Sequence, residues 1–203
     1  SSPINLYGAT KLASDKLFVA GNSYSGEHGT KFSVVRYGNV MGSRGSVIPF
    51  FMSIKDNGVL PITDERMTRF MISLEHAVDL VWHAFDDMVG GEIYVKKIPS
   101  MKVTDLARVV APEAKQEIIG IRPGEKLHEQ MISVEDAYYT YEYPEHFKIL
   151  PTINQWATCP KRIKDGKKVP EGFVYASDNN TEWMSDADLQ DWIETNREKI
   201  GSI

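Results

Sequence analysis

The sequence predicts an α/β fold with a mostly parallel sheet. Segments rich in β-branched and aromatic residues, such as 32–40 and 92–98, alternate with amphipathic helical segments, such as 74–88. The chain has 203 residues, of which 42% are hydrophobic. This is enough for one substantial domain or two small ones without disulfide cross-links.

Local signals define the individual elements. Pro3 is suited to the first turn of a helix, and Thr104 is expected to cap a helix that Pro112 ends. In chain order we expect a helix at 5–20, a strand at 32–40, a helix at 47–55, an extended piece at 60–63, a helix at 74–88, a strand at 92–98, a helix at 104–110, a strand at 117–121 and a last helix near 186–200. After about residue 138 the pattern weakens into an aromatic, turn-rich tail.

Composition excludes several classes of function. The net charge of −5 argues against a nucleic-acid surface, because phosphate backbones are bound by clustered Lys and Arg. No apolar stretch is long enough to span a membrane, and the first residues do not resemble a signal peptide. The single cysteine fits a reducing cytosol, so a cytoplasmic protein is expected. His76, His83 and His128 do not have the spacing of a metal site.

The first cluster that could carry chemistry is the pair Tyr7 and Lys11. Residues four apart on a helix lie on one face. A lysine cation beside a phenol favours the phenolate, which makes Tyr7 a candidate proton acceptor, and Lys11 can also donate to a cofactor ribose. Such a pair also occurs by chance in many helices, and that alternative stays open.

The second cluster is the segment 36–40, at the end of a predicted strand. Ligands of open α/β sheets bind beyond the carboxyl ends of the strands. Gly38 would let a flat ring or a backbone approach closely, and Asn39 offers both a donor and an acceptor. A strand-ending turn without any ligand is the alternative.

Two further clusters have the chemistry of a nucleotide-binding site. Arg69 and Arg122 carry guanidinium groups suited to a diphosphate, and Glu125 can accept hydrogen bonds from ribose hydroxyls. Pro61 and Ile62 offer an apolar seat for a base. An exposed loop with two arginines around Arg69 and a type II turn at 122–125 are the alternatives, and the turn is compatible with binding.

The order of these clusters resembles that of the extended short-chain dehydrogenase/reductase family. The segments 3–11, 43–51, 62–70, 97–102, 120–129 and 175–183 are similar to one subfamily, the inverting UDP-N-acetylglucosamine 4,6-dehydratases of pseudaminic acid and capsule-sugar pathways. The resemblance covers nearly the whole chain. It implies a cytoplasmic, homo-oligomeric lyase that acts on a UDP-sugar and has no nucleic-acid or membrane partner.

The resemblance also implies a mechanism. NADP, with NAD as the alternative, takes hydride from C4 of the sugar while Tyr7 removes the hydroxyl proton. Water then leaves across C5–C6, hydride returns to C6, and C5 is reprotonated on the opposite face.

Site residues follow from the same resemblance. Tyr7 and Lys11 are the expected catalytic residues, and no metal ligand is expected. The expected cofactor contacts are Tyr7, Lys11, Tyr37, Gly38, Asn39 and Val40. The expected substrate contacts are Asn39, Arg44, Ser46, Val47, Pro61, Ile62, Thr63, Arg69, Arg122 and Glu125.

The implied domains are the C-terminal portion of a Rossmann-like dinucleotide-binding domain and a substrate-binding subdomain. Residues 1–41 and 71–98 are assigned to the first, 42–70 and 99–141 to the second, and 142–203 to a tail with a final helix.

The sequence departs from the family pattern in two respects. It contains no Gly-rich pyrophosphate turn, and it begins just after the Thr-Asp-Lys run whose Asp and Lys serve elimination. The chain alone is therefore expected to be inactive, with a longer native protein or a separate N-terminal half supplying the rest. A UDP-sugar epimerase of the same superfamily and a non-catalytic UDP-sugar-binding fragment of a split enzyme are the alternatives.

Overall fold

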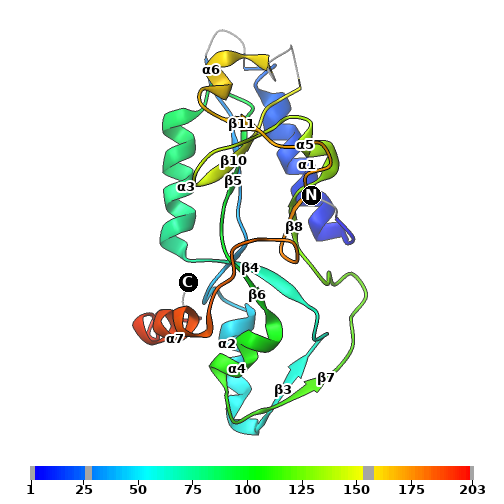
Figure 1. The fold of residues 1–203 in the computed structure, drawn as a ribbon, viewed down its shortest axis with the longest axis vertical. Coiled ribbons are helices and arrows are strands. Elements are labelled where there is room, and N and C mark those ends of the chain that lie inside the picture. Colours follow the sequence, from blue (N-terminus) through cyan, green and yellow to red (C-terminus); the bar gives the residue numbers. More distant parts are fainter. Residues whose placement is uncertain (1–2, 26–28, 153–157, 202–203) are drawn as a thin grey trace. The chain divides into compact units, whose positions relative to one another are not determined.

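The computed structural model describes residues 3–25, 29–152 and 158–201, and the chain forms two compact units (Figure 1). Part of the predicted tail, residues 153–157, lies outside the described residues. No helix in the described part of the chain is both long and apolar enough to cross a bilayer. Unit 1 consists of Ser1–Tyr37, Glu75–Lys97 and Gln130–Tyr175, and unit 2 of Gly38–Leu74, Ile98–Glu129 and Ala176–Ile203.

Unit 1 is built on a five-stranded mixed sheet in the order β1-β5-β10-β9-β11. β1 is parallel to β5, and the other neighbours are antiparallel. Its elements are α1 (Leu6–Gly21), β1 (Val34–Arg36), α3 (Leu74–Asp87), β5 (Ile93–Lys96), β8 (Gln130–Ile132), α5 (Val134–Ala137), β9 (Thr140–Glu142), β10 (His146–Ile149), α6 (Pro160–Ile163) and β11 (Lys167–Lys168), and β12 (Tyr175–Ala176) follows at the boundary with unit 2.

The prediction of a mostly parallel sheet is wrong for this unit. The tail after residue 138 supplies three antiparallel strands that the sequence pattern does not reveal. β9 and β11 have only three and two residues, too few to show alternation. All four residues of β10 are buried, including His146 and Lys148, so hydrophobicity does not mark it as a strand.

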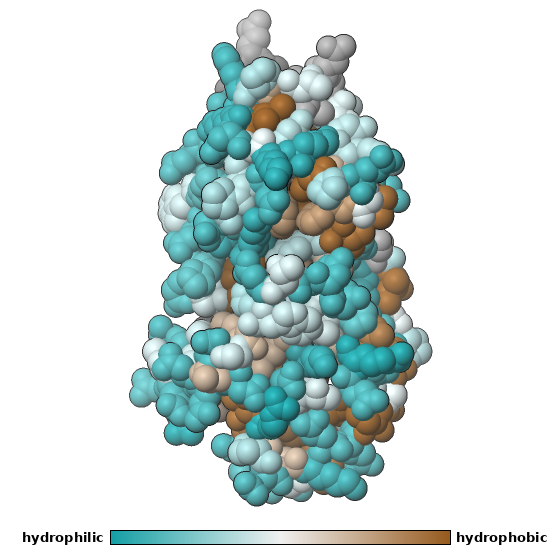
Figure 2. Space-filling view, viewed as in Figure 1, coloured by the Kyte–Doolittle hydropathy of each residue, from teal (hydrophilic) through white to brown (hydrophobic). Residues whose placement is uncertain are grey.

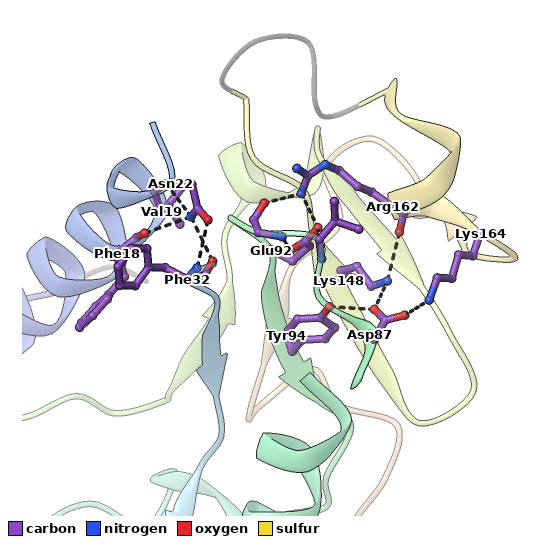
Figure 3. A network of polar contacts seen from close by, with 12 residues as sticks. Phe18, Val19, Asn22, Phe32, Asp87, Glu92, Tyr94, Lys148, Arg162 and Lys164 are labelled. Carbon is purple, nitrogen blue, oxygen red and sulfur yellow. Dashed lines mark hydrogen bonds and ion pairs between the residues drawn. The ribbon is translucent and has the colours of Figure 1, made fainter. Parts of the chain in front are cut away.

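A buried network of charges joins β10 and α6 to α3 and β5 (Figure 3). The Lys148 ammonium forms an ion pair with Asp87 at the end of α3, and it donates to the Arg162 carbonyl at 3.1 Å. The Tyr94 hydroxyl on β5 donates to the same Asp87 carboxylate at 2.7 Å. Arg162 in turn pairs with Glu92, which is 1% exposed. Removing one partner of a buried pair costs about 3–5 kcal/mol, so these contacts fix α6 and β10 in place.

The same network sets the protonation of its members. Burial alone would raise the pKa of Asp87, but hydrogen bonds from Lys148, Lys164 and Tyr94 outweigh it and hold that pKa well below its usual range. Burial and the Asp87 carboxylate raise the pKa of Tyr94. Asp87 is therefore an anion and Tyr94 a neutral donor at physiological pH.

His146 lies beside this network as a buried neutral ring. It stacks on Tyr143 with ring centres 4.6 Å apart, and the His83 ring centre is 4.5 Å away. Its Nε2 atom is buried and has no partner in the described part of the chain. Burial, followed by the charges of His83 and Lys148, lowers the pKa of His146 from 6.5 to about 4.

Unit 1 should therefore lose stability as the pH falls from about 6.5 toward about 4, because the unfolded chain binds a proton that folded His146 excludes. His146 should lower the free energy of unfolding by up to ~3 kcal/mol over this range. Urea unfolding at about pH 7.5 and about pH 5 measures the change in that free energy. In His146→Phe, which keeps the ring stack, the difference between the two pH values should shrink. An unchanged difference would exclude His146 as its source.

Unit 2 contains two small sheets and three helices of at least eight residues within the described residues. β2 is parallel to β4, β4 is antiparallel to β6, and β3 is parallel to β7. Its elements are β2 (Asn39–Val40), α2 (Val47–Ile54), the 3-10 helix η2 (Lys55–Asn57), β3 (Val59–Ile62), β4 (Thr68–Ile72), β6 (Ser100–Lys102), α4 (Val103–Val110), β7 (Lys115–Ile118) and α7 (Asp186–Thr195). Side chains of α2, β3, α4 and α7 form the core, among them Ile48, Phe51, Leu60, Ile62, Leu106 and Leu189.

Three element predictions are corrected in this unit. The strand predicted at 32–40 is two strands in different sheets, with the break at Tyr37 and Gly38. Thr104 is not a cap, because α4 follows β6 directly and Lys102 is its N-cap. The last helix ends at Thr195, and it begins with a capping box between Ser185 and Asp188.

Gly38 brings β2 close to β4. A Cβ atom at this position would lie 2.4 Å from the Phe70 Cβ atom and 2.7 Å from the Phe70 carbonyl oxygen. The close neighbour that the sequence suggested for Gly38 is thus a backbone, that of Phe70. The approach places Asn39 opposite Met71 in the parallel pair.

Gly38→Ala should therefore destabilise unit 2 by about 1–3 kcal/mol, as expected for an overpacked core position. Gly21→Ala is the control, because the three atoms nearest to its added Cβ belong to the Phe32 side chain, at 3.3 Å or more, and not to a backbone. Urea unfolding of both variants measures the difference. Equal stability of Gly38→Ala and the wild type would contradict a required close approach.

Candidate functional site

Unit 2 contains a pocket of about 730 Å³. Its lining includes nine of the residues expected to bind a substrate: Asn39, Arg44, Ser46, Val47, Pro61, Thr63, Arg69, Arg122 and Glu125. Apolar side chains that sequence reasoning did not select complete the wall: Met41, Ile48, Phe50, Phe51, Met67, Met71 and Val103. A mostly apolar wall with a few placed polar groups is the usual composition of a small-molecule site.

The pocket lies where a strand, a turn and a helix follow one another. Val40 at the end of β2 leads into a turn at 41–45, in which Gly42 and Gly45 have positive φ. This turn delivers Arg44 to the pocket, and Ser46 is the N-cap of α2. The hydrophobic pattern of α2 indicated a helix but not that its aromatic side chains face a cavity.

Alternation along β3 separates Pro61 from Ile62. Pro61 lines the pocket, whereas Ile62 is 0% exposed and belongs to the hydrophobic core. Successive strand residues point to opposite faces, so the two cannot both contact a ligand on one face. Ile62 supports the pocket from beneath instead of lining it.

Arg122 and Glu125 are joined by a tight turn. The Glu125 N–H donates to the Arg122 carbonyl at 3.0 Å, and Gly124 has a φ of 79°, as the third position of a type II turn requires. The Glu125 carboxylate accepts from the Thr63 hydroxyl at 3.3 Å and from the Arg122 N–H at 3.4 Å. The turn therefore holds a cation and an anion side by side at the pocket.

Arg69 on β4 is oriented by backbone carbonyls. Its Nη1 atom donates to the carbonyls of Thr68 at 2.7 Å and Leu127 at 3.2 Å, and Nη2 donates to Lys126 at 3.0 Å. Three of its five donor positions are thus used within the protein. Arg69 brings positive charge to the pocket wall, and the three carbonyl contacts fix the direction of its guanidinium group.

Glu129 is a residue of this region that sequence reasoning missed. Its carboxylate accepts from the Phe70 N–H at 3.4 Å and lies 3.9 Å from Arg69 Nε. Burial raises the pKa of Glu129, while the Arg69 charge acts in the opposite direction. The only sequence signal was an acidic residue four positions after Glu125, which is common on any surface.

In unit 1 the structure brings Tyr7 and Lys11 together on α1. The Lys11 ammonium lies 5.4 Å from the centre of the Tyr7 ring, and Tyr7 is 72% exposed. The Asn5 side chain caps the helix by accepting from the Gly8 N–H at 2.7 Å. Tyr37, also in unit 1, is 42% exposed. The predicted catalytic pair thus belongs to unit 1, and all ten predicted substrate contacts belong to unit 2.

Arg36 has a structural role within unit 1. Its guanidinium pairs with Asp15 on α1 and Asp136 on α5, each at 2.8 Å, and donates to the Met131 carbonyl at 2.8 Å. The 36–40 segment therefore combines an anchoring arginine with a pocket residue, Asn39.

Comparisons with known proteins identify relatives of this chain. The chain is 54% identical over 199 residues to a UDP-N-acetylglucosamine 4,6-dehydratase (inverting) of Campylobacter jejuni, covering 95% of this chain and 60% of the relative. It is 41% identical over 171 residues to a UDP-glucose 4-epimerase of Rickettsia conorii, covering 82% of this chain and 50% of that protein. The crystal structure of Pen from Bacillus thuringiensis matches 97% of this chain and 59% of its own, with a TM-score of 0.82 and 34% identity.

The structural match confirms the predicted α/β fold class with its Rossmann-like portion. The chain spans about 60% of the length of the dehydratase relative. The family model described as "Polysaccharide biosynthesis protein" matches residues 1–151. On this match, which covers most of the chain, the protein belongs to that polysaccharide biosynthesis family.

Proposed function

We propose that the chain is the substrate-binding and Tyr-Lys-bearing part of a UDP-N-acetylglucosamine 4,6-dehydratase that inverts C5. The observation that carries this proposal is the pocket of unit 2, which combines cations, hydrogen-bond acceptors and apolar walls. The 54% identity to the Campylobacter jejuni dehydratase supports the same reaction.

The pocket has a suitable group for each part of a UDP-sugar. Arg122 and Arg44 line it as cations and would neutralise the diphosphate. Glu125, held by Thr63 and the turn, would accept from ribose hydroxyls. Pro61 and the methionine side chains of the wall offer an apolar surface to the base or the sugar ring. Unit 2 is accordingly the nucleotide-sugar-binding part in this proposal.

Unit 1 would carry the acid–base group and part of the cofactor site. Tyr7 and Lys11 share one exposed helix face, which fits a phenol that exchanges a proton with the sugar 4-hydroxyl and a lysine that donates to a ribose. The cofactor, NADP in this proposal with NAD as the alternative, would supply the acceptor and donor of hydride. Tyr37 of unit 1 and Val40, which lines the pocket of unit 2, are the remaining side chains proposed for cofactor contact.

Unit 1 also presents an apolar surface that a further α/β segment would cover. No residue of α1 is buried, and its apolar residues Leu6 and Leu17 are 81% and 72% exposed. β1 is the end strand of the sheet as described, and parallel strands are normally covered on both faces. Beside it runs an apolar groove of about 240 Å³ lined by Phe18, Phe32, Val35, Phe85 and Met88 among others.

Apolar side chains also reach the surface seen in Figure 2, where they appear brown. We propose that the portion of the family protein that this chain does not match packs on the apolar surface of unit 1. It would also supply the pyrophosphate-binding turn and the elimination residues, so the chain alone would be inactive. A cytoplasmic homo-oligomer is part of the same proposal.

A 4-epimerase is the second candidate, favoured by the 41% identity to the Rickettsia conorii enzyme. It would use the same Tyr-Lys pair and the same pocket. The higher identity to the dehydratase, over more of the chain, favours the dehydratase.

Arg122→Ala should weaken binding of UDP-N-acetylglucosamine by about 1.5–3 kcal/mol, the usual value of a lost charge-assisted hydrogen bond. This corresponds to roughly tenfold to a hundredfold in Kd, measured by isothermal titration calorimetry. Arg66→Ala is the matched control, because Arg66 pairs with Asp64 and is absent from the pocket wall. An unchanged Kd for Arg122→Ala would remove Arg122 from the site.

Tyr7→Phe should abolish turnover and leave UDP affinity nearly unchanged, because only the proton-exchanging hydroxyl is lost. The assay mixture contains the chain, the portion of the family protein that the chain does not match, UDP-N-acetylglucosamine and NADP. The mass of the sugar nucleotide is then measured by mass spectrometry. Loss of one water from the wild-type product supports a dehydratase, whereas an unchanged mass with altered stereochemistry at C4 points to an epimerase. Tyr24→Phe, at a residue that is 87% exposed, is the control. Turnover by Tyr7→Phe would refute the role of Tyr7.

A further inference from the structure

The Asn39 amide faces the Glu129 carboxylate at the edge of the pocket. When the amide nitrogen of Asn39 faces Glu129, it lies 3.1 and 3.2 Å from the two carboxylate oxygens. Burial raises the pKa of Glu129, while the Arg69 charge and the Phe70 N–H favour its carboxylate form. Against that carboxylate, the opposite orientation would bring two acceptors together without a proton between them. The carboxylate therefore decides which end of the amide turns toward it.

Glu129 is itself held firmly by its surroundings. Its N–H donates to the Ser177 hydroxyl at 2.9 Å, and its carbonyl accepts from the Ser177 N–H at 2.8 Å. The Ser177 hydroxyl lies 2.7 Å from the hydroxyl of Thr68, which lies 2.8 Å from His128 Nδ1. Thr68 and Ser177 are 3% and 0% exposed. This network fixes the backbone of Glu129. The carboxylate itself is contacted by the Phe70 N–H at 3.4 Å and lies 3.9 Å from Arg69 Nε.

The two residues differ in their access to a ligand. Asn39 lines the pocket, whereas Glu129 does not. With its nitrogen committed to Glu129, the Asn39 amide turns its oxygen away from the carboxylate. An amide oxygen is an acceptor only, so it suits an O–H or N–H group and repels a phosphate oxygen.

We infer that Glu129 is a positioning residue that makes Asn39 a hydrogen-bond acceptor for a donor group of the bound nucleotide sugar. This inference rests on the proposed function. It adds that Asn39 accepts, and does not donate, the hydrogen bond to the ligand. The donor is a hydroxyl or amide N–H of the hexose, or an imide N–H or hydroxyl of the uridine. Asn39 thus selects for a neutral donor at its place in the pocket, and the arginines contact the diphosphate.

Glu129→Gln tests the inference with little change in shape. A glutamine can donate to the Asn39 oxygen or accept from its nitrogen, so the amide loses its single orientation. Binding of UDP-N-acetylglucosamine should weaken about threefold to tenfold, the usual range for one hydrogen bond. In an Asn39→Ala background, Glu129→Gln should change Kd less than about twofold, because the group it positions is gone.

Glu117→Gln is the matched control, at an exposed acidic residue of β7 that is not among the pocket residues. Glu129→Asp is a second variant that keeps the charge but withdraws the carboxylate by one methylene group. It should show a smaller loss with the same dependence on Asn39. Glu129→Asp replaces Glu129→Gln in the binding test if Glu129→Gln does not unfold cooperatively as the wild type does.

Titrations with UDP alone separate the two sources of the donor group. Equal losses for UDP and UDP-N-acetylglucosamine place the donor on the uridine, and a loss seen only with the sugar nucleotide places it on the hexose. An equal loss in the Asn39→Ala background would overturn the role of Glu129 while leaving the proposed function intact. If the wild-type chain binds neither ligand, the proposed function fails and this inference fails with it.

Discussion

The candidate site of unit 2 depends on the close approach of β2 and β4. Gly38 touches the backbone of Phe70, and this contact puts Asn39 into register with Met71 on the neighbouring strand. The turn that follows β2 then carries Arg44 and Ser46 to the same pocket that Arg69 reaches from β4. One glycine thus allows residues about 30 positions apart to share a wall.

Polar contacts then orient the residues that the backbone brings together. Carbonyls of Lys126 and Leu127 fix Arg69, a type II turn fixes Arg122 beside Glu125, and Glu129 fixes Asn39. Each of these partners lies between residues 122 and 129. The segment after β7 therefore contributes pocket-lining side chains and also sets the direction of those on the strands.

Much of this arrangement could be predicted from the sequence. Long periodic helices such as α3 and turns with obligatory residues, such as Pro123-Gly124, are specified by local chemistry. Nine residues predicted to contact a substrate line one pocket. The polar ones among them were selected because polar groups at strand ends and turns have few structural reasons to be there. The tail strands were missed because β10 contains the buried polar residues His146 and Lys148, so its sequence does not show the hydrophobic pattern of a buried strand. Ile62 was misplaced because its face depends on the alternation of β3, and Glu129 was missed because its role exists only through Asn39.

The most direct test of the central claim is a methyl NMR titration of the methionine-labelled protein with UDP-N-acetylglucosamine. Met41, Met67 and Met71 line the pocket of unit 2, whereas Met88 and Met131 belong to unit 1. Saturable shifts of the first three methyl signals, with little change in the other two, are the predicted result. Shifts confined to Met88 and Met131, or no saturable shift at all, would contradict a nucleotide-sugar site in this pocket.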